Sequence, residues 1–375
     1  MFPRLKTFLS VFPISETTWV LRGGADEQWR IKLTDERAVR ALGALLPYLT
    51  GKTSVDAILD AVEGQGVHRP AAAAVLRQLE ATSLLEDADA CGLTGPELHR
   101  YDHQIRYFSR FTQQGGAKLQ AVLRGSHVAL LADGVLGESL YGRLAGAGVG
   151  RVTVLSRQPS EAAAWADGVA EPRPRTTVVE IDAEKIWPET SPDLAQPAVS
   201  QPDLPQLLIV CQDAHHPRLL EAVDALSKRR GLPWLLVRHL DLQEGWIGPL
   251  FVPGETASYL SLEARLRSNM TSFNEYLAFD AHVRTNGASP AFGGLHAAFD
   301  LLASIAVIEA VKYLTDFKVP ELLGRFLTIN FWTWETELHD VLRLPSLDRP
   351  DSSRPPVFPW KVVSHEDGAP SSRRP

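Results

Sequence analysis

The sequence predicts an α/β protein in which a small module of strands and helices precedes a larger, doubly wound parallel sheet. Three observations lead to this prediction. Short β-prone runs come before three amphipathic helical patterns within residues 1–90. From residue 116 onward, apolar strand-like runs alternate with helical stretches, which is typical of parallel sheets. Within that part, residues 127–150 read as a buried strand, a tight glycine-containing turn and a helix.

The small module is expected to span residues 1–90. Its strand candidates are Val11–Ser15, Thr18–Arg22 and Gln28–Leu33, with Gly23, Gly24 and Asp26 supplying a turn. Apolar spacing then predicts a helix over 39–49 that Pro47 bends in its last turn, a second helix capped by Thr53 or Ser54, and a third beginning at Pro70. The order β-β-β-α-α-α in so short a stretch is that of a compact winged-helix domain.

A connector over 91–115 leads into the larger domain, which is expected to span 116–345. Its parallel strand candidates are His127–Leu131, Arg151–Leu155, Thr177–Ile181, Leu207–Cys211 and Trp234–Val237. The apolar run 296–315 predicts a core helix, and 325–342 predicts a terminal pair of strands.

Two stretches have the composition of irregular chain. Residues 186–206 are rich in proline and predict a mobile loop. Residues 346–375 are rich in Pro, Ser and Arg and predict a disordered tail, in which Phe358 and Trp360 are the side chains able to dock elsewhere.

Composition limits the function classes. The chain has 375 residues, a hydrophobic content of 45%, a charged content of 22% and a net charge of −7. The acidic balance argues against nucleic acid as the main partner. Cys91 and Cys211 cannot supply a four-cysteine zinc site. No apolar run reaches the roughly 18–20 residues of a membrane span, and no signal-peptide pattern is present, so we expect a cytoplasmic protein without membrane contact.

The turn at 132–137, ADGVLG, is the strongest local signal. A dinucleotide-binding turn normally begins with glycine, but Ala132 occupies that position here, while Gly134 and Gly137 remain. An acid that holds ribose usually ends the second strand, but Ser156 and Arg157 stand there. The pattern therefore indicates a nucleotide-binding fold that lacks the first glycine of the turn and the acid that holds ribose.

Three further polar residues follow the strand 207–211. Asp213 stands where a metal-binding carboxylate would be useful, with a loop or helix-cap role as an equal alternative. His215 and His216 are adjacent, so their side chains diverge, and exposed or capping roles are favoured over metal ligation.

The block GPLFVPGETASYLSLEAR, residues 248–265, resembles ubiquitin-activating-enzyme-like proteins of the ThiF and MoeB class. That class has a C-x-x-C zinc pair where Ser258 and Ser261 stand, and a second pair where SLDRPDS follows VLRLP without cysteine. The segment RYDHQIRYF is similar to the class's RYxRQ segment, with His103 in place of an arginine that reaches the ATP phosphates, often across a dimer. The resemblance thus implies no zinc site, no required cofactor and doubtful ATP binding.

The pairing of this degenerate fold with the N-terminal module resembles the ocin-ThiF-like proteins and the C-domain of azoline cyclodehydratases, over most of residues 10–345. These families serve the biosynthesis of ribosomally made, modified peptides. The resemblance implies a non-catalytic partner that binds a precursor leader peptide and presents it to a YcaO-type cyclodehydratase for thiazole or oxazole formation. The alternative is an active adenylating enzyme that uses MgATP through Gly134, Gly137 and Asp213. A homodimer is a further open alternative, since relatives often dimerise.

In that family the N-terminal module is the peptide-recognition element. By resemblance, the leader adds as a strand beside Gln28–Leu33, with the third helix as the groove wall. The expected contact residues are Gln28, Trp29, Arg30, Ile31, Lys32, Leu33, Arg69, Ala71, Ala74, Val75, Arg77 and Gln78. The alanines would leave room for bulky leader side chains and the basic residues would meet acidic ones; plain helix propensity and a solvated face are equal alternatives. DNA binding by the third helix is disfavoured by the acidic charge.

Overall fold

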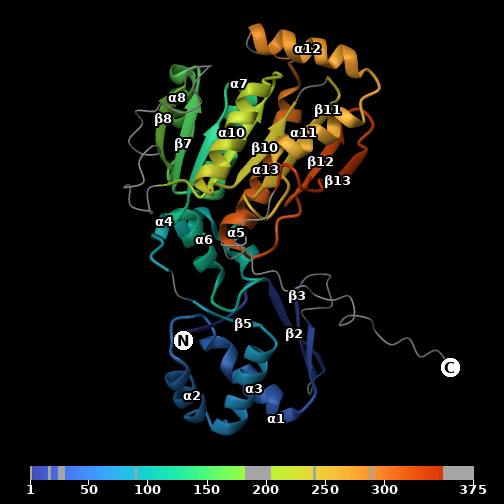
Figure 1. Cartoon of the computed structure of the whole chain (residues 1–375). Helices are drawn as coiled ribbons and strands as arrows, with labels where there is room; N and C mark the ends of the chain where they lie inside the picture. The colour runs from blue at the N-terminus through green and yellow to red at the C-terminus, as the bar shows by residue number, and fades with distance from the viewer. Residues whose placement is uncertain are drawn as a thin grey trace, which may run out of the picture.

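The computed structural model describes residues 2–15, 18–23, 30–88, 91–181, 204–239, 242–286, 289, 291 and 293–348. Figure 1 shows a small N-terminal module, a neck of short helices and a larger α/β part. Gln28, Trp29, most of the proline-rich stretch 186–206 and the chain after Asp348 lie outside the described residues.

The N-terminal module contains the three expected strands and the three expected helices in order, together with two short strands, β1 (Pro3–Leu5) and β5 (Leu85–Asp87), that the sequence did not predict. Its other elements are β2 (Leu9–Ser15), β3 (Thr18–Gly23), β4 (Arg30–Leu33), α1 (Glu36–Leu45), α2 (Val55–Glu63) and α3 (Arg69–Ala81). β2, β3 and β4 form an antiparallel sheet with β3 in the centre, and β1 pairs with β5. Leu42, Leu45, Ile58 and Val62 are fully buried between the sheet and the helices. The amphipathic helices therefore pack on one face of this sheet, and β2 and β4 are its edge strands.

The first helix ends earlier than its apolar pattern suggests. α1 stops at Leu45, and Pro47 lies in a single 3₁₀ turn, η2 (Leu46–Tyr48). Proline has no N–H to donate to the preceding turn, so the α-helix gives way to a tighter turn there.

The neck joins the module to the larger part through α4 (Gly95–Arg100), α5 (Asp102–Phe108) and α6 (Gly116–Gly125). Glu86 of β5 is fully buried, and its carboxylate accepts hydrogen bonds from Arg4 Nε at 2.9 Å and from the backbone N–H of Gly116 at 3.4 Å. At the other end, the side chains of Gln104 and Gln120 both donate to the carbonyl of Ala147. The RYDHQIRYF segment therefore packs against the end of the helix that follows the glycine turn.

The larger part contains an eight-stranded mixed sheet in the order β13-β12-β11-β10-β9-β6-β7-β8. Its strands are β6 (His127–Leu131), β7 (Arg151–Ser156), β8 (Arg175–Glu180), β9 (Leu207–Gln212), β10 (Trp234–Arg238), β11 (Glu244–Phe251), β12 (Arg325–Asn330) and β13 (Thr336–Asp340). The five strands from β8 to β10 are parallel, as expected, whereas β11, β12 and β13 run antiparallel. The α/β class is confirmed, and the sheet is extended by an antiparallel half.

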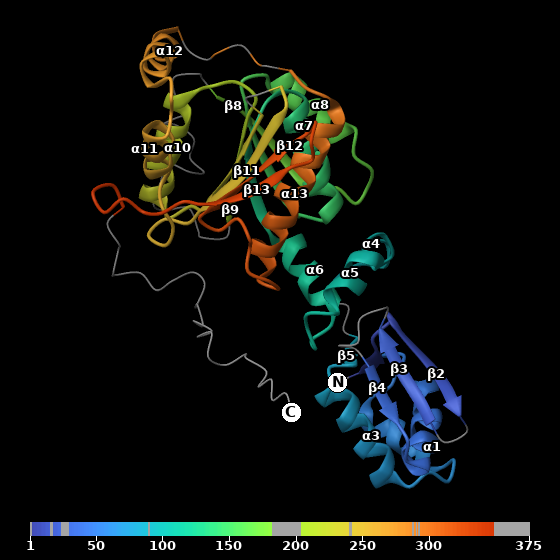
Figure 2. The same ribbon diagram turned by 90° about the vertical axis from the view of Figure 1, so that its right-hand side faces the viewer.

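Helices cover both faces of this sheet (Figure 2). They are α7 (Gly134–Ala147), α8 (Pro159–Asp167) and α13 (His296–Thr315) on one side, and α10 (Pro217–Arg230), α11 (Tyr259–Ser268) and α12 (Phe273–Asn286) on the other. Leu140, Leu144 and Leu302 lie in the core of the first side, and Val223, Trp234 and Tyr259 in that of the second. No helix in the described part of the chain is both long and apolar enough to cross a bilayer.

The turn between β12 and β13 is tightly hydrogen-bonded and displays two tryptophans. Asn330 Oδ1 accepts from the backbone N–H groups of Trp332 at 2.9 Å and Thr333 at 3.1 Å. The side chains of Trp332 and Trp334 are nevertheless 69% exposed. The turn is thus rigid in its backbone and apolar at its tip.

Candidate functional site

The glycine turn lies at the switch point of the parallel strands. After β6 the chain runs outward through β7 and β8, then returns to β9 on the opposite side of β6. Open α/β sheets bind their ligands in the crevice at this point, outside the carboxyl ends of the strands. The turn Ala132–Asp133 and the start of α7 therefore occupy the position where a ligand would be expected.

The two remaining glycines have different structural reasons. Gly134 has a φ of +65°, a conformation that side chains disfavour. A Cβ on Gly137 would lie 2.8 Å from the Cβ of Ala132 and 2.7 Å from Cη2 of Trp165. Gly137 is thus needed for close packing, and the methyl group of Ala132 fills space beside the first turn of α7.

Asp133, which the sequence analysis did not single out, connects the turn to the end of the second strand. Its Oδ1 accepts from Ser156 Oγ at 2.6 Å and from the Arg157 backbone N–H at 2.9 Å. Its Oδ2 accepts from Arg157 Nε at 2.7 Å. Ser156 and Arg157, which stand in place of a ribose-binding acid, are therefore hydrogen-bonded to Asp133 of the turn. The signal was present: an acid in the turn together with Ser-Arg at the strand end.

A second carboxylate faces the same helix start. Asp213 Oδ2 lies 3.7 Å from where a Cβ on Gly134 would stand. Burial raises the pKa of the nearby Cys211 thiol well above its ordinary value, and the charges of Asp213 and Asp133 raise it further. A helix N-terminus normally attracts anions, but here two acidic side chains already approach it.

The space left at this site is small among the described residues. The cavity bounded by Ala132, Asp133, Arg157, Asp213 and His216 has a volume of about 30 Å³, roughly that of one water molecule. Pockets for small-molecule ligands typically measure about 300–1,000 Å³. The side chains of the turn and of Arg157 thus occupy the crevice.

His215 and His216 are only 7% and 8% exposed, so the expectation that they are exposed is wrong. His216 does occupy the N-cap position of α10, without a capping hydrogen bond from its side chain. His215 stacks on Phe279 at 5.5 Å between ring centroids, and its Nε2 lies 3.5 Å from Asp280 Oδ1. Burial lowers the pKa of both imidazoles. The described residues include no group of three or more His, Cys, Asp or Glu side chains able to hold a metal ion. His215 instead belongs to the packing between α10 and α12.

Ser258 and Ser261, which stand where the resembled class has a pair of zinc cysteines, belong to a hydrogen-bonded cluster around Asp348. Ser261 Oγ donates to Asp348 Oδ2 at 2.5 Å, and the backbone N–H of Ser258 donates to Oδ1 at 3.2 Å. The N–H of Leu344 adds a bond of 3.3 Å to Oδ2. Burial favours the neutral carboxyl, but these hydrogen bonds hold the pKa of Asp348 below its ordinary value. One carboxylate thus joins the start of α11 to the chain after β13.

On the N-terminal module, β4 is an edge strand, and Figure 2 shows it on the side of the sheet toward α3. Lys32 is exposed, while Leu33 is 5% exposed and belongs to the core. Arg30 and Ile31 pair through their backbones with Arg22 and Leu21, and their side chains lie outside the described residues.

The expected contact residues of α3 divide into two groups. Ala74, Arg77 and Gln78 are exposed and Ala71 is half-buried, but Val75 is 3% exposed and packs in the core of the module. Arg69 forms ion pairs with Asp60 and Glu63 of α2. Fewer side chains of α3 are therefore accessible to a peptide than the sequence predicted.

Comparison with known proteins gives no sequence relative, since no protein-family model and no curated protein matches the chain. Solved structures do resemble it. The heterocyclase TruD aligns with 93% of this chain and 42% of its own, with 20% identity and a TM-score of 0.62. A heterocyclase in complex with substrate and cofactor aligns with 93% of this chain and 39% of its own, with 18% identity and a TM-score of 0.61.

A third similar structure is E. coli MccB in complex with AMPCPP and MccA, which aligns with 92% of this chain and 98% of its own, with 16% identity and a TM-score of 0.57. The chain therefore spans about two fifths of the heterocyclases and almost all of MccB. At these identities the likeness shows the fold. The chain has the α/β fold of MccB, which is also the fold of the matching part of the heterocyclases.

Proposed function

We propose that this protein is a non-catalytic component of a peptide-modifying system. Residues 1–90 bind the leader of a ribosomally made precursor peptide, and the larger part docks on a separate YcaO-type cyclodehydratase. That partner uses ATP to form thiazoline or oxazoline rings in the core peptide. The likeness to two heterocyclases, which align with 93% of this chain, supports a role in the heterocyclisation of a peptide.

The observation that carries the non-catalytic part of the proposal is the filled crevice at the switch point. Asp133 takes up the hydrogen-bond donors of Ser156 and Arg157, and about 30 Å³ remains among the described residues. Phosphate would also approach a helix start that two carboxylates already face, which is electrostatically unfavourable.

The edge strand β4 supports the binding part of the proposal. A leader peptide that adds beside β4 gains main-chain hydrogen bonds, and side chains of α3 provide specificity. Tethering the leader gives the core peptide a high effective concentration at the partner's active site. This protein then contributes delivery of the substrate, without making bonds itself.

A second candidate function is an active adenylating enzyme that uses MgATP on a peptide. The position of Asp213 beside the start of α7 favours it, because a magnesium-binding carboxylate would be useful there.

One experiment on the full chain separates the two functions. The isolated protein is mixed with ATP, Mg²⁺ and a candidate precursor peptide, and pyrophosphate release is measured together with fluorescence polarisation of the labelled leader. We expect leader binding without pyrophosphate release. Release that disappears in Asp213→Asn would establish the adenylating enzyme. Absence of leader binding would refute the peptide-recognition assignment.

A further inference from the structure

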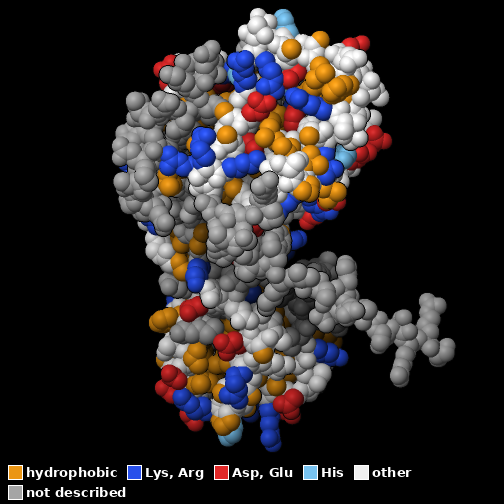
Figure 3. All heavy atoms as spheres, viewed as in Figure 1, with side chains coloured by type: hydrophobic (Ala, Val, Ile, Leu, Met, Phe, Trp, Pro, Cys, Tyr) orange, Lys and Arg blue, Asp and Glu red, His pale blue; other side chains and the backbone are white. Residues whose placement is uncertain are grey.

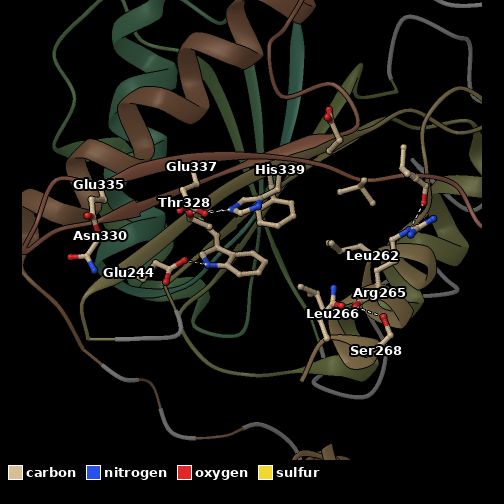
Figure 4. Close-up of a pocket in the computed structure, with 16 residues that line it drawn as sticks. Glu244, Leu262, Arg265, Leu266, Ser268, Thr328, Asn330, Glu335, Glu337 and His339 are labelled. Atoms are coloured by element: carbon tan, nitrogen blue, oxygen red, sulfur yellow. Dashed lines mark hydrogen bonds and ion pairs between the residues drawn. The ribbon is translucent and has the colours of Figure 1, made fainter. Parts of the chain in front are cut away.

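A second hollow of the surface lies far from the glycine turn. It is a groove of about 620 Å³ between α11 and the antiparallel strands β11, β12 and β13. Figure 4 shows Leu262 and Leu266 of α11 on one side of this groove, and Glu337 and His339 of β13 on the other. Figure 3 shows apolar side chains gathered over this part of the surface, with acidic side chains at its outer edge.

The floor of the groove is a ladder of stacked rings. Trp246 of β11 stacks on Phe326 of β12 with 4.5 Å between centroids and an interplanar angle of 13°. Phe326 stacks in turn on His339 of β13 at 4.6 Å and 20°. At the inner end, the guanidinium of Arg238 lies 5.5 Å from the ring of Trp246. The ring faces contact one another and Phe326 is only 7% exposed, whereas Trp246 and His339 are half-buried and line the groove, where their ring edges can contact apolar side chains.

The rim of the groove is acidic. Glu244, Glu335, Glu337 and Asp340 line it, against one basic side chain, Arg265.

That arginine is already engaged, because its Nε donates to the carbonyl of Leu342 at 2.7 Å. Asp340 is paired with Arg325. Within the described part of the chain, no lysine or arginine pairs with Glu335 or Glu337. The groove therefore suits an extended segment that combines aromatic or aliphatic side chains with positive charge.

We propose that this groove is the docking site for residues 354–363 of the same chain, RPPVFPWKVV, which lie outside the described residues. Arg354 and Lys361 are the only charged residues of this segment, and both are positive. Phe358 and Trp360 supply aromatic rings for the ladder. The prolines favour an extended conformation, which lowers the entropy lost on docking.

The distance between the two sites permits this docking. Asp348 is fixed at the start of α11 by Ser258 and Ser261, and the groove follows that helix to Asn269. Ten helical residues cover about 15 Å, whereas the six residues from Asp348 to Arg354 can extend over about 20 Å. Because the tether is short, the local concentration of the segment is in the millimolar range, so even weak contacts hold it in place. The proposal does not depend on leader binding by residues 1–90.

Hydrogen exchange of the full chain tests the proposal. We expect the amides of residues 354–363 to exchange at least tenfold more slowly than in an unstructured peptide of the same sequence. Glu335→Lys combined with Glu337→Lys removes this protection, and adding Arg354→Glu and Lys361→Glu restores it. Glu161→Lys, an exposed charge reversal on α8, serves as the matched control and leaves the protection unchanged.

Carbodiimide cross-linking provides a second readout that does not rely on the variants. Lys361 is expected to form an amide with Glu335 or Glu337 within one chain. Exchange of 354–363 at the unstructured rate in the wild-type protein refutes the docking. The cross-linking is repeated on a mixture of ¹⁴N- and ¹⁵N-labelled protein. Cross-links between differently labelled chains would show that the segment docks on a second copy and would refute docking within one chain. Protection of β13 that arises only when the precursor peptide is added would assign the groove to that peptide instead.

Discussion

At the scale of single residues, Asp348 is the side chain whose effect on stability can be predicted most directly. Its carboxylate accepts hydrogen bonds from Ser261 Oγ and from two backbone N–H groups, those of Ser258 and Leu344. Hydrogen bonds of this kind are strongest when the carboxyl group is charged. The local fold therefore needs Asp348 to be ionised.

We predict that Asp348→Asn lowers the free energy of unfolding by about 1–2 kcal/mol at pH 7, because an amide accepts these hydrogen bonds less well than a carboxylate. The folded-state pKa of Asp348 is below its ordinary value of 3.8. The stabilisation is therefore complete above that value and is lost as the pH falls through the folded pKa.

Urea unfolding of the two proteins at pH 7 and near pH 3 measures this effect, and the difference between them should shrink at the lower pH. Asp167→Asn, at a side chain that is 87% exposed, is the matched control. A chelator should leave both unfolding curves unchanged. A clear loss of stability on chelation would show that a metal contributes after all.

Gly137 gives a second prediction at this scale. Gly137→Ala places a Cβ 2.8 Å from Ala132 and 2.7 Å from Trp165, and we expect a loss of about 1–3 kcal/mol from overpacking. Gly142→Ala, on the same helix with open space around the added Cβ, should instead be neutral or stabilise by up to about 1 kcal/mol. Thermal unfolding compares them. Equal stability of the two variants would mean that Trp165 moves aside freely.

At the scale of elements, the proposed leader-binding site consists of the edge strand β4 and the helix α3. Lys32 and Arg77 are exposed, but Arg69 is held by Asp60 and Glu63. Only the first two are free to meet acidic leader side chains.

We therefore predict that Lys32→Glu and Arg77→Glu each weaken leader binding about tenfold at low salt, because like charges then face each other. Fluorescence polarisation of a labelled leader measures this. Arg40→Glu, an exposed reversal on α1, is the control. By contrast, Arg69→Ala should reduce the stability of the module more than its affinity. Unchanged affinity in both charge variants would place the peptide on another edge.

The elements also show what the sequence could predict. The parallel strands were recognisable because each is a short, continuous apolar run, and β6 matches its expected bounds. β1 and β5 have only three residues each, too few for a pattern. The cluster around Asp348 joins residues about 90 positions apart, and no local pattern reports such a contact. The burial of His215 depends on α12 in the same way.

At the scale of the whole molecule, two compact parts are joined through buried polar contacts. Glu86 binds Arg4 and the N–H of Gly116, and Gln104 and Gln120 bind the end of α7. Removing one partner of such a hydrogen bond is costly, so these contacts stabilise the packing of the neck on the elements at both of its ends. Figure 1 shows the result, with the module on one side of the neck and the sheet on the other.

The two exposed tryptophans at the tip of the β12–β13 hairpin can be used as intrinsic fluorescence probes. Trp165 and Trp234 are buried and emit from an apolar environment, whereas Trp332 and Trp334 are in water. Among the tryptophans of the described residues, these two are the most accessible to acrylamide, since Trp19 and Trp246 are half-buried. Any protein that covers the tip will shift the emission to shorter wavelength and slow the quenching, without a dye or a label.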